Sequence, residues 1–169
     1  MIRVMGIDPG SRTTGYGVVE MDGNRLTHVA HGAISSPAGA PAPQRLAVIY
    51  RGLCEVLAAY APEEVCVESI FHSRNAQTAL KLGQARGVAL LAAELQDLPI
   101  VEYAPMEVKS AVVGYGRAEK QQVQDMVRRL LRLPESIGTD AADALAVAIC
   151  HVQTRSTAEA YLRRRVARQ

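Results

Sequence analysis

The chain has 169 residues, of which 49% are hydrophobic, and it carries a formal net charge of +2 at pH 7. This length and apolar content fit one globular domain, and no apolar run approaches the roughly 20 residues that span a bilayer. The N-terminus meets Gly6, Asp8 and Pro9 too early for a secretory signal peptide. We therefore expect a cytoplasmic protein without a membrane-spanning segment.

The charge is spread unevenly along the chain. Five arginines and one glutamate follow His151, a local charge of +4, which leaves −2 for the first 150 residues. We predict a folded domain over residues 1–154 and a basic tail over 155–169, whose order the sequence leaves open. Such a tail either touches nucleic acid or serves solubility.

The chain contains three cysteines, each flanked by apolar residues: Cys54, Cys66 and Cys150. Their odd number and wide spacing predict buried free thiols rather than a disulfide or a zinc site.

The first part of the chain predicts an antiparallel meander. Apolar and alternating runs predict strands over residues 2–7, 14–20 and 26–34, with a hairpin turn at 21–24. Gly15 and Gly17 interrupt the second run, so we expect another group to lie close to the backbone there. That group is either a neighbouring strand or a ligand.

The rest of the chain alternates helices with strands. The expected order is helix 44–60, strand 65–70, helix 76–96, strand 99–103, a short helix from 105, a helix over 118–133 and a final helix from 139. This order predicts an α/β fold with a mixed sheet, in which two parallel strands follow three antiparallel ones and helices cover both faces.

Two glycines, Gly83 and Gly87, lie one turn apart in the helix predicted over 76–96. Glycine costs a helix interior about 1 kcal/mol relative to alanine, so the close approach of another backbone is a physical reason for both. The neighbour is either the sheet or a second subunit.

Four carboxylates lie in apolar surroundings, where a charge needs a partner. Asp8 ends the first strand at a Pro-Gly turn, and Glu68 takes the same place after the apolar run 65–67. Asp140 and Asp143 are three residues apart, which puts both on one face of the final helix. Each alone has an ordinary explanation, namely a turn, an arginine partner or a helix dipole, but together they favour a common site.

The chemistry of these four side chains predicts a magnesium or manganese site. Hard oxygen ligands suit these ions, and no histidine or cysteine lies close to the acids in sequence, which argues against zinc. A cluster of carboxylates without a cofactor motif is typical of two-metal phosphoryl chemistry. Without metal, mutual repulsion should raise some of the carboxyl pKa values.

Three further side chains have two readings each. Phe71, the only phenylalanine, follows a strand in a polar setting, so core packing and ligand stacking are equally consistent with its position. Lys109 and Lys120 flank a glycine-rich turn. The position of each fits either an ammonium group that contacts a phosphate or one that is simply solvated.

These motifs, in this order, resemble those of the RuvC-type Holliday junction resolvases, a family with the ribonuclease-H-like fold. The resemblance runs from about residue 3 to residue 151. It is carried by GIDPG at 6–10, TGYG at 14–17, VE at 67–68 followed by Phe71 and Asn75, ALKLGQARG at 79–87, AEK at 118–120 with QV at 122–123, and DAADALA at 140–146.

The resemblance implies a homodimeric, magnesium-dependent crossover junction endodeoxyribonuclease that acts in DNA recombination and repair. Such an enzyme binds four-way DNA junctions and nicks two strands symmetrically, leaving 5′-phosphate and 3′-hydroxyl ends. The resemblance also implies two Mg²⁺ ions per active site, with Mn²⁺ as a substitute, and coupling to the RuvA–RuvB branch-migration complex.

The resemblance also implies roles for individual residues. Catalysis and metal binding fall to the four acids, Asp8, Glu68, Asp140 and Asp143. The residues implied to bind DNA are Phe71, Asn75, Lys109 and Lys120, of which Phe71 would stack on opened bases. The dimer interface is implied to include Gly83 and Gly87. Some family members carry histidine in place of Asp140, so this ligand varies.

Two other classes compete with this interpretation. Actin-like ATPases and sugar kinases also begin with a Gly-Ile-Asp-x-Gly hairpin, but they need two such domains around a nucleotide, and this chain has room for one. A junction-binding scaffold that does not cut DNA keeps the basic residues but leaves the four acids unexplained beside a polyanion.

Overall fold

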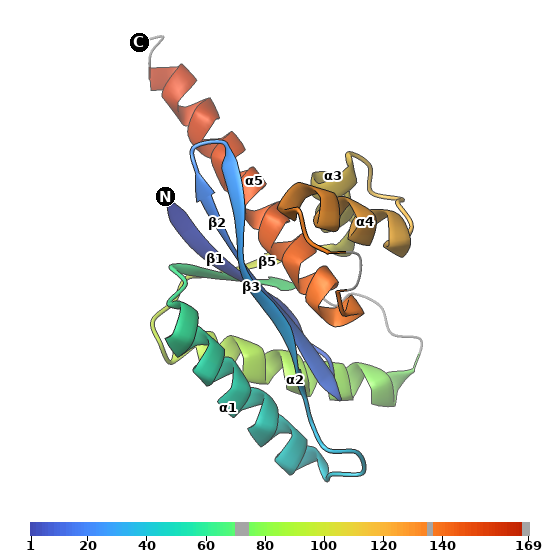
Figure 1. Ribbon diagram of the computed structural model, residues 1–169. Helices are drawn as coiled ribbons and strands as arrows, with labels where there is room; N and C mark the ends of the chain where they lie inside the picture. The colour runs from blue at the N-terminus through green and yellow to red at the C-terminus, as the bar shows by residue number, and fades with distance from the viewer. Residues whose placement is uncertain (70–74, 135–136, 167–169) are drawn as a thin grey trace.

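A computed structural model describes residues 1–69, 75–134 and 137–166, with side chains as far as Arg155 (Figure 1). Its elements are β1 (Ile2–Asp8), β2 (Thr13–Asp22), β3 (Arg25–Ser35), α1 (Ala42–Tyr60), β4 (Glu64–Glu68), α2 (Ala76–Glu94), β5 (Ile100–Tyr103), α3 (Pro105–Val113), α4 (Lys120–Leu131) and α5 (Thr139–Val166). Phe71 lies outside the described residues. No helix in the described part of the chain is long and apolar enough to cross a membrane.

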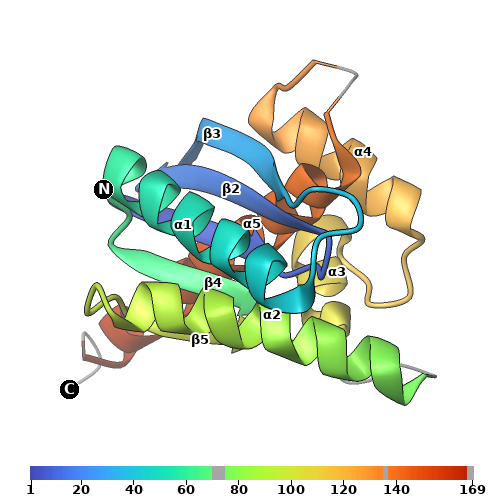
Figure 2. The same ribbon diagram turned by 90° about the horizontal axis from the view of Figure 1, so that it is seen from below.

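One five-stranded sheet, in the order β3-β2-β1-β4-β5, organises the fold. Strands β1, β2 and β3 are antiparallel neighbours, whereas β4 runs parallel to β1, and β5 runs parallel to β4. This confirms the predicted mixed sheet. Helices cover both faces, as expected: α1 and α2 lie side by side on one, and α3, α4 and α5 lie on the other (Figures 1 and 2).

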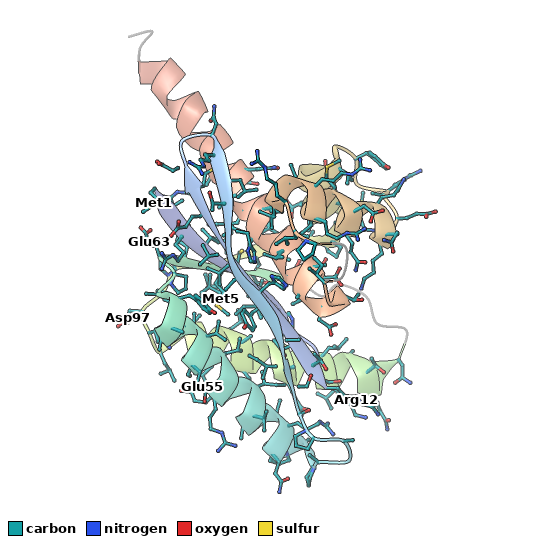
Figure 3. All side chains as sticks on the ribbon, in the orientation of Figure 1. Met1, Met5, Arg12, Glu55, Glu63 and Asp97 are labelled. Atoms are coloured by element: carbon teal, nitrogen blue, oxygen red, sulfur yellow. The ribbon has the colours of Figure 1, made fainter. Side chains whose placement is uncertain are left out.

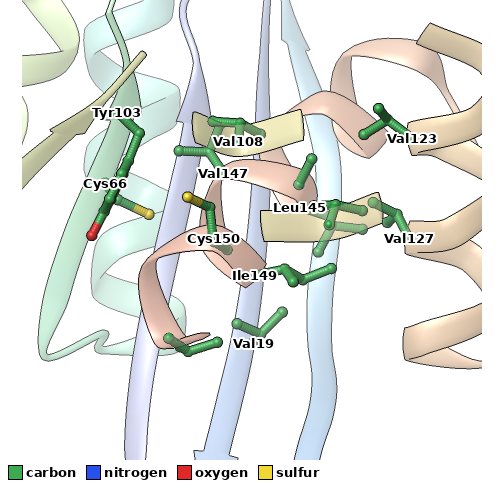
Figure 4. Packing of buried hydrophobic residues seen from close by; sticks show 14 of the residues in the cluster. Val19, Cys66, Tyr103, Val108, Val123, Val127, Leu145, Val147, Ile149 and Cys150 are labelled. Carbon is green, nitrogen blue, oxygen red and sulfur yellow. The ribbon is translucent and has the colours of Figure 1, made fainter. Parts of the chain in front are cut away.

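The continuous apolar run of β1 reflects burial on both faces of the sheet. Met5 and Ile7 pack with α1 and α2, and Figure 3 shows Met5 pointing into this layer while Glu55 of α1 points to solvent. Val4 belongs instead to the cluster on the opposite face. There Leu145 of α5 packs with residues of α3 and α4 (Figure 4).

Helix α5 lies directly on β1 and β2 because glycines remove the side chains that would separate them. A Cβ added at any of three glycines would overlap α5. It would lie 2.1 Å from the Ala144 carbonyl oxygen at Gly6 and 2.0 Å from the Asp140 carbonyl oxygen at Gly15. At Gly17 it would lie 2.6 Å from the Leu145 side chain. The expectation of a neighbouring strand or ligand at Gly15 and Gly17 was therefore wrong. The close neighbour is a helix.

A chain of polar side chains fastens the middle of α5 to the sheet. The Nδ1 atom of His151 lies 2.9 Å from the Tyr103 hydroxyl, and its Nε2 atom lies 2.6 Å from Glu64 Oε2. Burial, followed by the nearby Cys150 and Cys66, raises the pKa of Tyr103 to about 12. The phenol therefore stays protonated, and the His151 ring links its hydroxyl to the Glu64 carboxylate, which Arg155 also contacts.

Some element boundaries differ from those predicted. Helix α4 begins at Lys120 rather than residue 118, because Glu119 is extended and its backbone N–H donates to the Gln122 side chain at 2.9 Å in a capping arrangement. Helix α5 continues to Val166, so the predicted tail over 155–169 begins inside this helix. The three cysteines are free thiols, with Cys66 and Cys150 buried as predicted and Cys54 only half-buried.

We predict that Gly15→Ala destabilises the protein by about 1–3 kcal/mol, the usual cost of overpacking, because its Cβ would overlap the Asp140 carbonyl oxygen. The free energy of unfolding in urea measures this loss. Gly138→Ala is the control, because it adds the same methyl group just before α5, where no atom of the described residues lies within 4 Å. Equal effects of the two substitutions would contradict the close contact at Gly15.

Candidate active site

Two of the predicted acids leave the sheet at the same edge. Strands β1 and β4 pair in parallel as far as Ile7 and Val67, and Asp8 and Glu68 are the next residues of each strand. Because parallel strands end at a common edge, the two carboxylates are brought together.

The turn after Asp8 is braced by a buried hydroxyl. Thr14 is fully buried, and its Oγ1 donates to the Gly10 carbonyl oxygen at 3.2 Å and lies 3.4 Å from the Gly10 backbone N–H. The Asp8 carboxylate is therefore not needed to hold its own Pro-Gly turn.

Helix α5 brings the other two acids to this edge. Gly15 pairs with Asp8 across the β1–β2 ladder, and Asp140 lies directly over Gly15. Asp143 follows one turn later. The structure thus brings all four predicted acids together, from two strand ends and the first turns of one helix.

The acids influence one another strongly. Burial, then the charges of Asp143, Glu68 and Asp140, raises the pKa of Asp8 from 3.8 to about 7, and Lys120 opposes this shift. Burial and Asp143 likewise raise the pKa of Glu68. This agrees with the repulsion expected from the sequence, and Asp8 consequently titrates near neutral pH in the metal-free protein.

Helix α4 contacts both oxygens of Asp143. The Lys120 ammonium lies 2.6 Å from Oδ2, and the Gln124 side-chain amide donates to Oδ1 at 3.3 Å. Burial lowers the pKa of Lys120, but the hydrogen bond and charge of Asp143 outweigh this, so its pKa is raised. Gln124 did not emerge from the sequence, although its spacing of four from Lys120 places both on one helical face.

Lys109 lies on the other side of a small cleft. Its ammonium donates to the Ala118 carbonyl oxygen at 2.8 Å and, like Lys120, partly opposes the rise in the pKa of Glu68. The cleft measures about 190 Å³ and is lined by Glu68, Pro105, Val108, Lys109, Lys120, Val123, Asp143 and Ala146. A wider hollow of about 1280 Å³ lies between β3 and the end of α4, but none of the four acids lines it.

Asn75 has a structural role that the sequence did not indicate. Its Oδ1 accepts from the backbone N–H groups of Gln77 at 2.8 Å and Thr78 at 3.4 Å, so it caps the N-terminus of α2. The predicted neighbour Phe71 falls outside the described residues.

Gly83 and Gly87 lie on an exposed face of α2. No atom of the described chain lies within 4 Å of a Cβ added at either position, so the sheet is not their close neighbour. Leu80 and Leu91 on the same helix are 65% and 50% exposed. A stripe of glycine and leucine is therefore left open to solvent.

The donor chemistry of the acid cluster fits a hard divalent cation. Among the described residues, no three His, Cys, Asp or Glu side chains are arranged to enclose a metal ion, and Asp143 is instead occupied by Lys120 and Gln124. The Lys120 ammonium thus supplies positive charge to the Asp143 carboxylate. Carboxylate oxygens are the ligands that Mg²⁺ and Mn²⁺ prefer.

We predict that Asp8→Asn stabilises the metal-free protein more at pH 8 than at pH 5. A raised pKa in the folded state means that the Asp8 contribution to stability is full below about pH 4 and is lost as the pH rises through 7. Asp8→Asn removes this titration, so it should raise the free energy of unfolding by roughly 2 kcal/mol more at pH 8 than at pH 5. Thermal unfolding with a chelator measures the difference.

The control for this prediction is Asp125→Asn. The pKa of Asp125 is lowered, first by a hydrogen bond from Gln121 and then by Arg128. Asp125→Asn should therefore not stabilise the protein more at pH 8 than at pH 5. An equal effect of Asp8→Asn at both pH values would contradict the crowding of Asp8 by other acids.

Known proteins share both the sequence and the fold of this chain. Residues 4–151 match the family model described as crossover junction endodeoxyribonuclease RuvC. A relative of that name from Syntrophotalea carbinolica is 61% identical over 150 residues, which cover 89% of this chain and 93% of the relative. Another from Geotalea uraniireducens is 55% identical over 153 residues, or 90% of each chain.

A solved structure agrees with these relatives. T. thermophilus RuvC in complex with Holliday junction substrate superposes with a TM-score of 0.88 at 36% identity, covering 94% of this chain and 97% of that one. With a family model matched from residue 4 to residue 151 and relatives more than half identical, this chain belongs to the RuvC family of crossover junction endodeoxyribonucleases.

Proposed function

We propose that this chain is a structure-selective DNA endonuclease that resolves Holliday junctions in recombination and repair. The observation that carries the proposal is the convergence of four carboxylates beside two lysines, where burial and then the other acids raise the pKa of Asp8 to about 7. The relatives are named as crossover junction endodeoxyribonucleases, and the similar solved structure holds a Holliday junction substrate.

Asp8, Glu68, Asp140 and Asp143 would hold the divalent ions, Mg²⁺ with Mn²⁺ as a substitute. Their four negative charges offset those of two such ions. When bound, the ions supply an activated water and stabilise the leaving oxygen of the phosphodiester. The products would be 5′-phosphate and 3′-hydroxyl ends.

The lysines make this acidic site compatible with DNA. A cluster of carboxylates alone repels phosphate, whereas the ammonium groups of Lys109 and Lys120 line the same cleft and offset that charge. The Lys120 side chain is 60% exposed, so it can leave Asp143 and reach a phosphate when cations replace it. We assign both lysines to the scissile region of the DNA.

Base recognition would come from the segment that precedes α2. Asn75 caps α2, so its side chain is held at the N-terminus of this helix, where we assign it to DNA binding. We assign Phe71 to stacking on bases opened at the junction, an interaction of roughly 1–3 kcal/mol.

A homodimer would match the symmetry of the substrate. The exposed stripe of α2 allows two copies of this helix to approach at Gly83 and Gly87, with Leu80 and Leu91 burying apolar surface at its edges. A two-fold dimer would present one active site to each of two strands of like polarity, giving symmetric nicks.

The remaining assignments follow from membership of the family. The nuclease domain would cover residues 1–154, in keeping with a family match that ends at residue 151, and the basic segment 155–169 would follow it, beginning inside α5. The partner would be the RuvA–RuvB branch-migration complex. We infer a cytoplasmic location for this DNA-cleaving activity.

We predict that the protein makes paired nicks in a synthetic four-way junction but not in a linear duplex of the same sequence. Cleavage should require Mg²⁺ or Mn²⁺ and stop with a chelator. Asp8→Asn should still bind the junction, and more tightly because one negative charge is gone, but should cut it at least about 100-fold more slowly, since each lost catalytic contribution is worth several kcal/mol. Denaturing gels of end-labelled strands measure the cleavage.

Each failure of this experiment has its own meaning. Wild-type protein that binds the junction with Mg²⁺ and never cuts it would be a scaffold, and the nuclease proposal would fall. Asp8→Asn that cuts at the wild-type rate would remove Asp8 from the metal site.

We predict that Gly87→Leu weakens the dimer at least about tenfold, because its side chain would stand where two α2 backbones approach. Sedimentation equilibrium measures the dissociation constant. Lys81→Leu is the control, since it adds leucine at another exposed position of α2, away from the glycine stripe. An unchanged dissociation constant for Gly87→Leu would move the interface elsewhere on the molecule.

A further inference from the structure

Helix α4 offers Asp143 two different kinds of contact. Lys120 and Gln124 are four residues apart and reach opposite oxygens of the same carboxylate, at 2.6 Å and 3.3 Å. The ammonium is positively charged and competes with a cation for the carboxylate. The amide of Gln124 is neutral, so its hydrogen bond can persist when a cation binds the other oxygen.

Packing fixes the place of Gln124 more firmly than that of Lys120. Its neighbour Val123 is 6% exposed, and Val127, one turn further along α4, is fully buried in the cluster that includes α5. Gln124 itself is half-buried, whereas the Lys120 side chain is 60% exposed. The two buried valines therefore hold the α4 backbone that carries Gln124 against the layer of α5.

We propose that Gln124 is a positioning residue, which orients the Asp143 carboxylate toward the divalent ion by donating to Oδ1. This inference rests on the proposed role of Asp143 as a metal ligand. Groups that hydrogen-bond to a metal-binding carboxylate fix its direction, and their loss typically costs 10–100-fold in metal affinity or activity. Gln124 supplies this restraint without adding charge.

The same helix contains a matched control. Gln121 donates from its side-chain amide to Asp125 Oδ1 at 3.0 Å, an equivalent amide–carboxylate pair on the exposed face of α4. Methionine has nearly the length of glutamine and a similar helix propensity but no N–H donor. Gln124→Met and Gln121→Met therefore remove the same kind of bond at two places on one helix.

The experiment is a Mg²⁺ titration of wild type and both variants with two readouts. The first is junction cleavage, and the second is the thermal shift of the protein without DNA. For Gln124→Met we expect the Mg²⁺ midpoint to rise about 10–100-fold in both, with the maximal cleavage rate retained at saturating Mg²⁺. Gln121→Met should match wild type, and all three should unfold alike and bind the junction equally in chelator.

The outcomes separate this inference from the proposed function. Wild-type protein with neither cleavage nor a Mg²⁺-dependent shift would overturn the metal site itself. A responsive wild type with an unchanged Mg²⁺ midpoint in Gln124→Met would overturn the positioning role alone. Weaker junction binding in chelator with an unchanged midpoint would make Gln124 a DNA contact and also overturn it.

Discussion

The direct contact between α5 and the glycines of β1 and β2 determines where the acids meet. Helix α5 carries Asp140 and Asp143, but it can reach the end of β1 only because Gly6, Gly15 and Gly17 leave no side chain in between. The helix matches this surface with small residues of its own, since alanine is its main buried residue type. Glycine on the strands and alanine on the helix together bring two elements, distant in sequence, within reach of Asp8.

This arrangement has an electrostatic cost that the fold offsets locally. Burial, and then the mutual repulsion of the carboxylates, raises the pKa of Asp8 and of Glu68, and partners from the layer of α3 and α4 reduce this cost. Lys109 and Lys120 both line the cleft and oppose the shift of Glu68, and Lys120 also forms an ion pair with Asp143. The same two helices thus cover the apolar face of α5 and supply positive charge at its start.

Much of this could be predicted from the sequence, because strands that end in a lone carboxylate and a helix with two acids on one face are local patterns. The features that were not predicted depend on tertiary contacts or, for the length of α5, on the absence of a residue that ends a helix. Nothing near Gly15 indicates that its neighbour is α5, and nothing near Gln124 indicates that its partner is Asp143. Helix α5 runs on to Val166 because no glycine or proline follows Gly138 to end it.

The chain of polar side chains through His151 has a geometric consequence for the acids. Glu64 and Glu68 are the two ends of β4, and α5 is fastened to Glu64 by His151 and Arg155, two to three turns beyond Asp143. Strand β4 is therefore joined to α5 at its first residue, Glu64. At its last residue, Glu68, the strand meets the start of α5 in the acid cluster. The separation of Glu68 from Asp143 is set in part by contacts at the opposite end of β4, which touch neither residue.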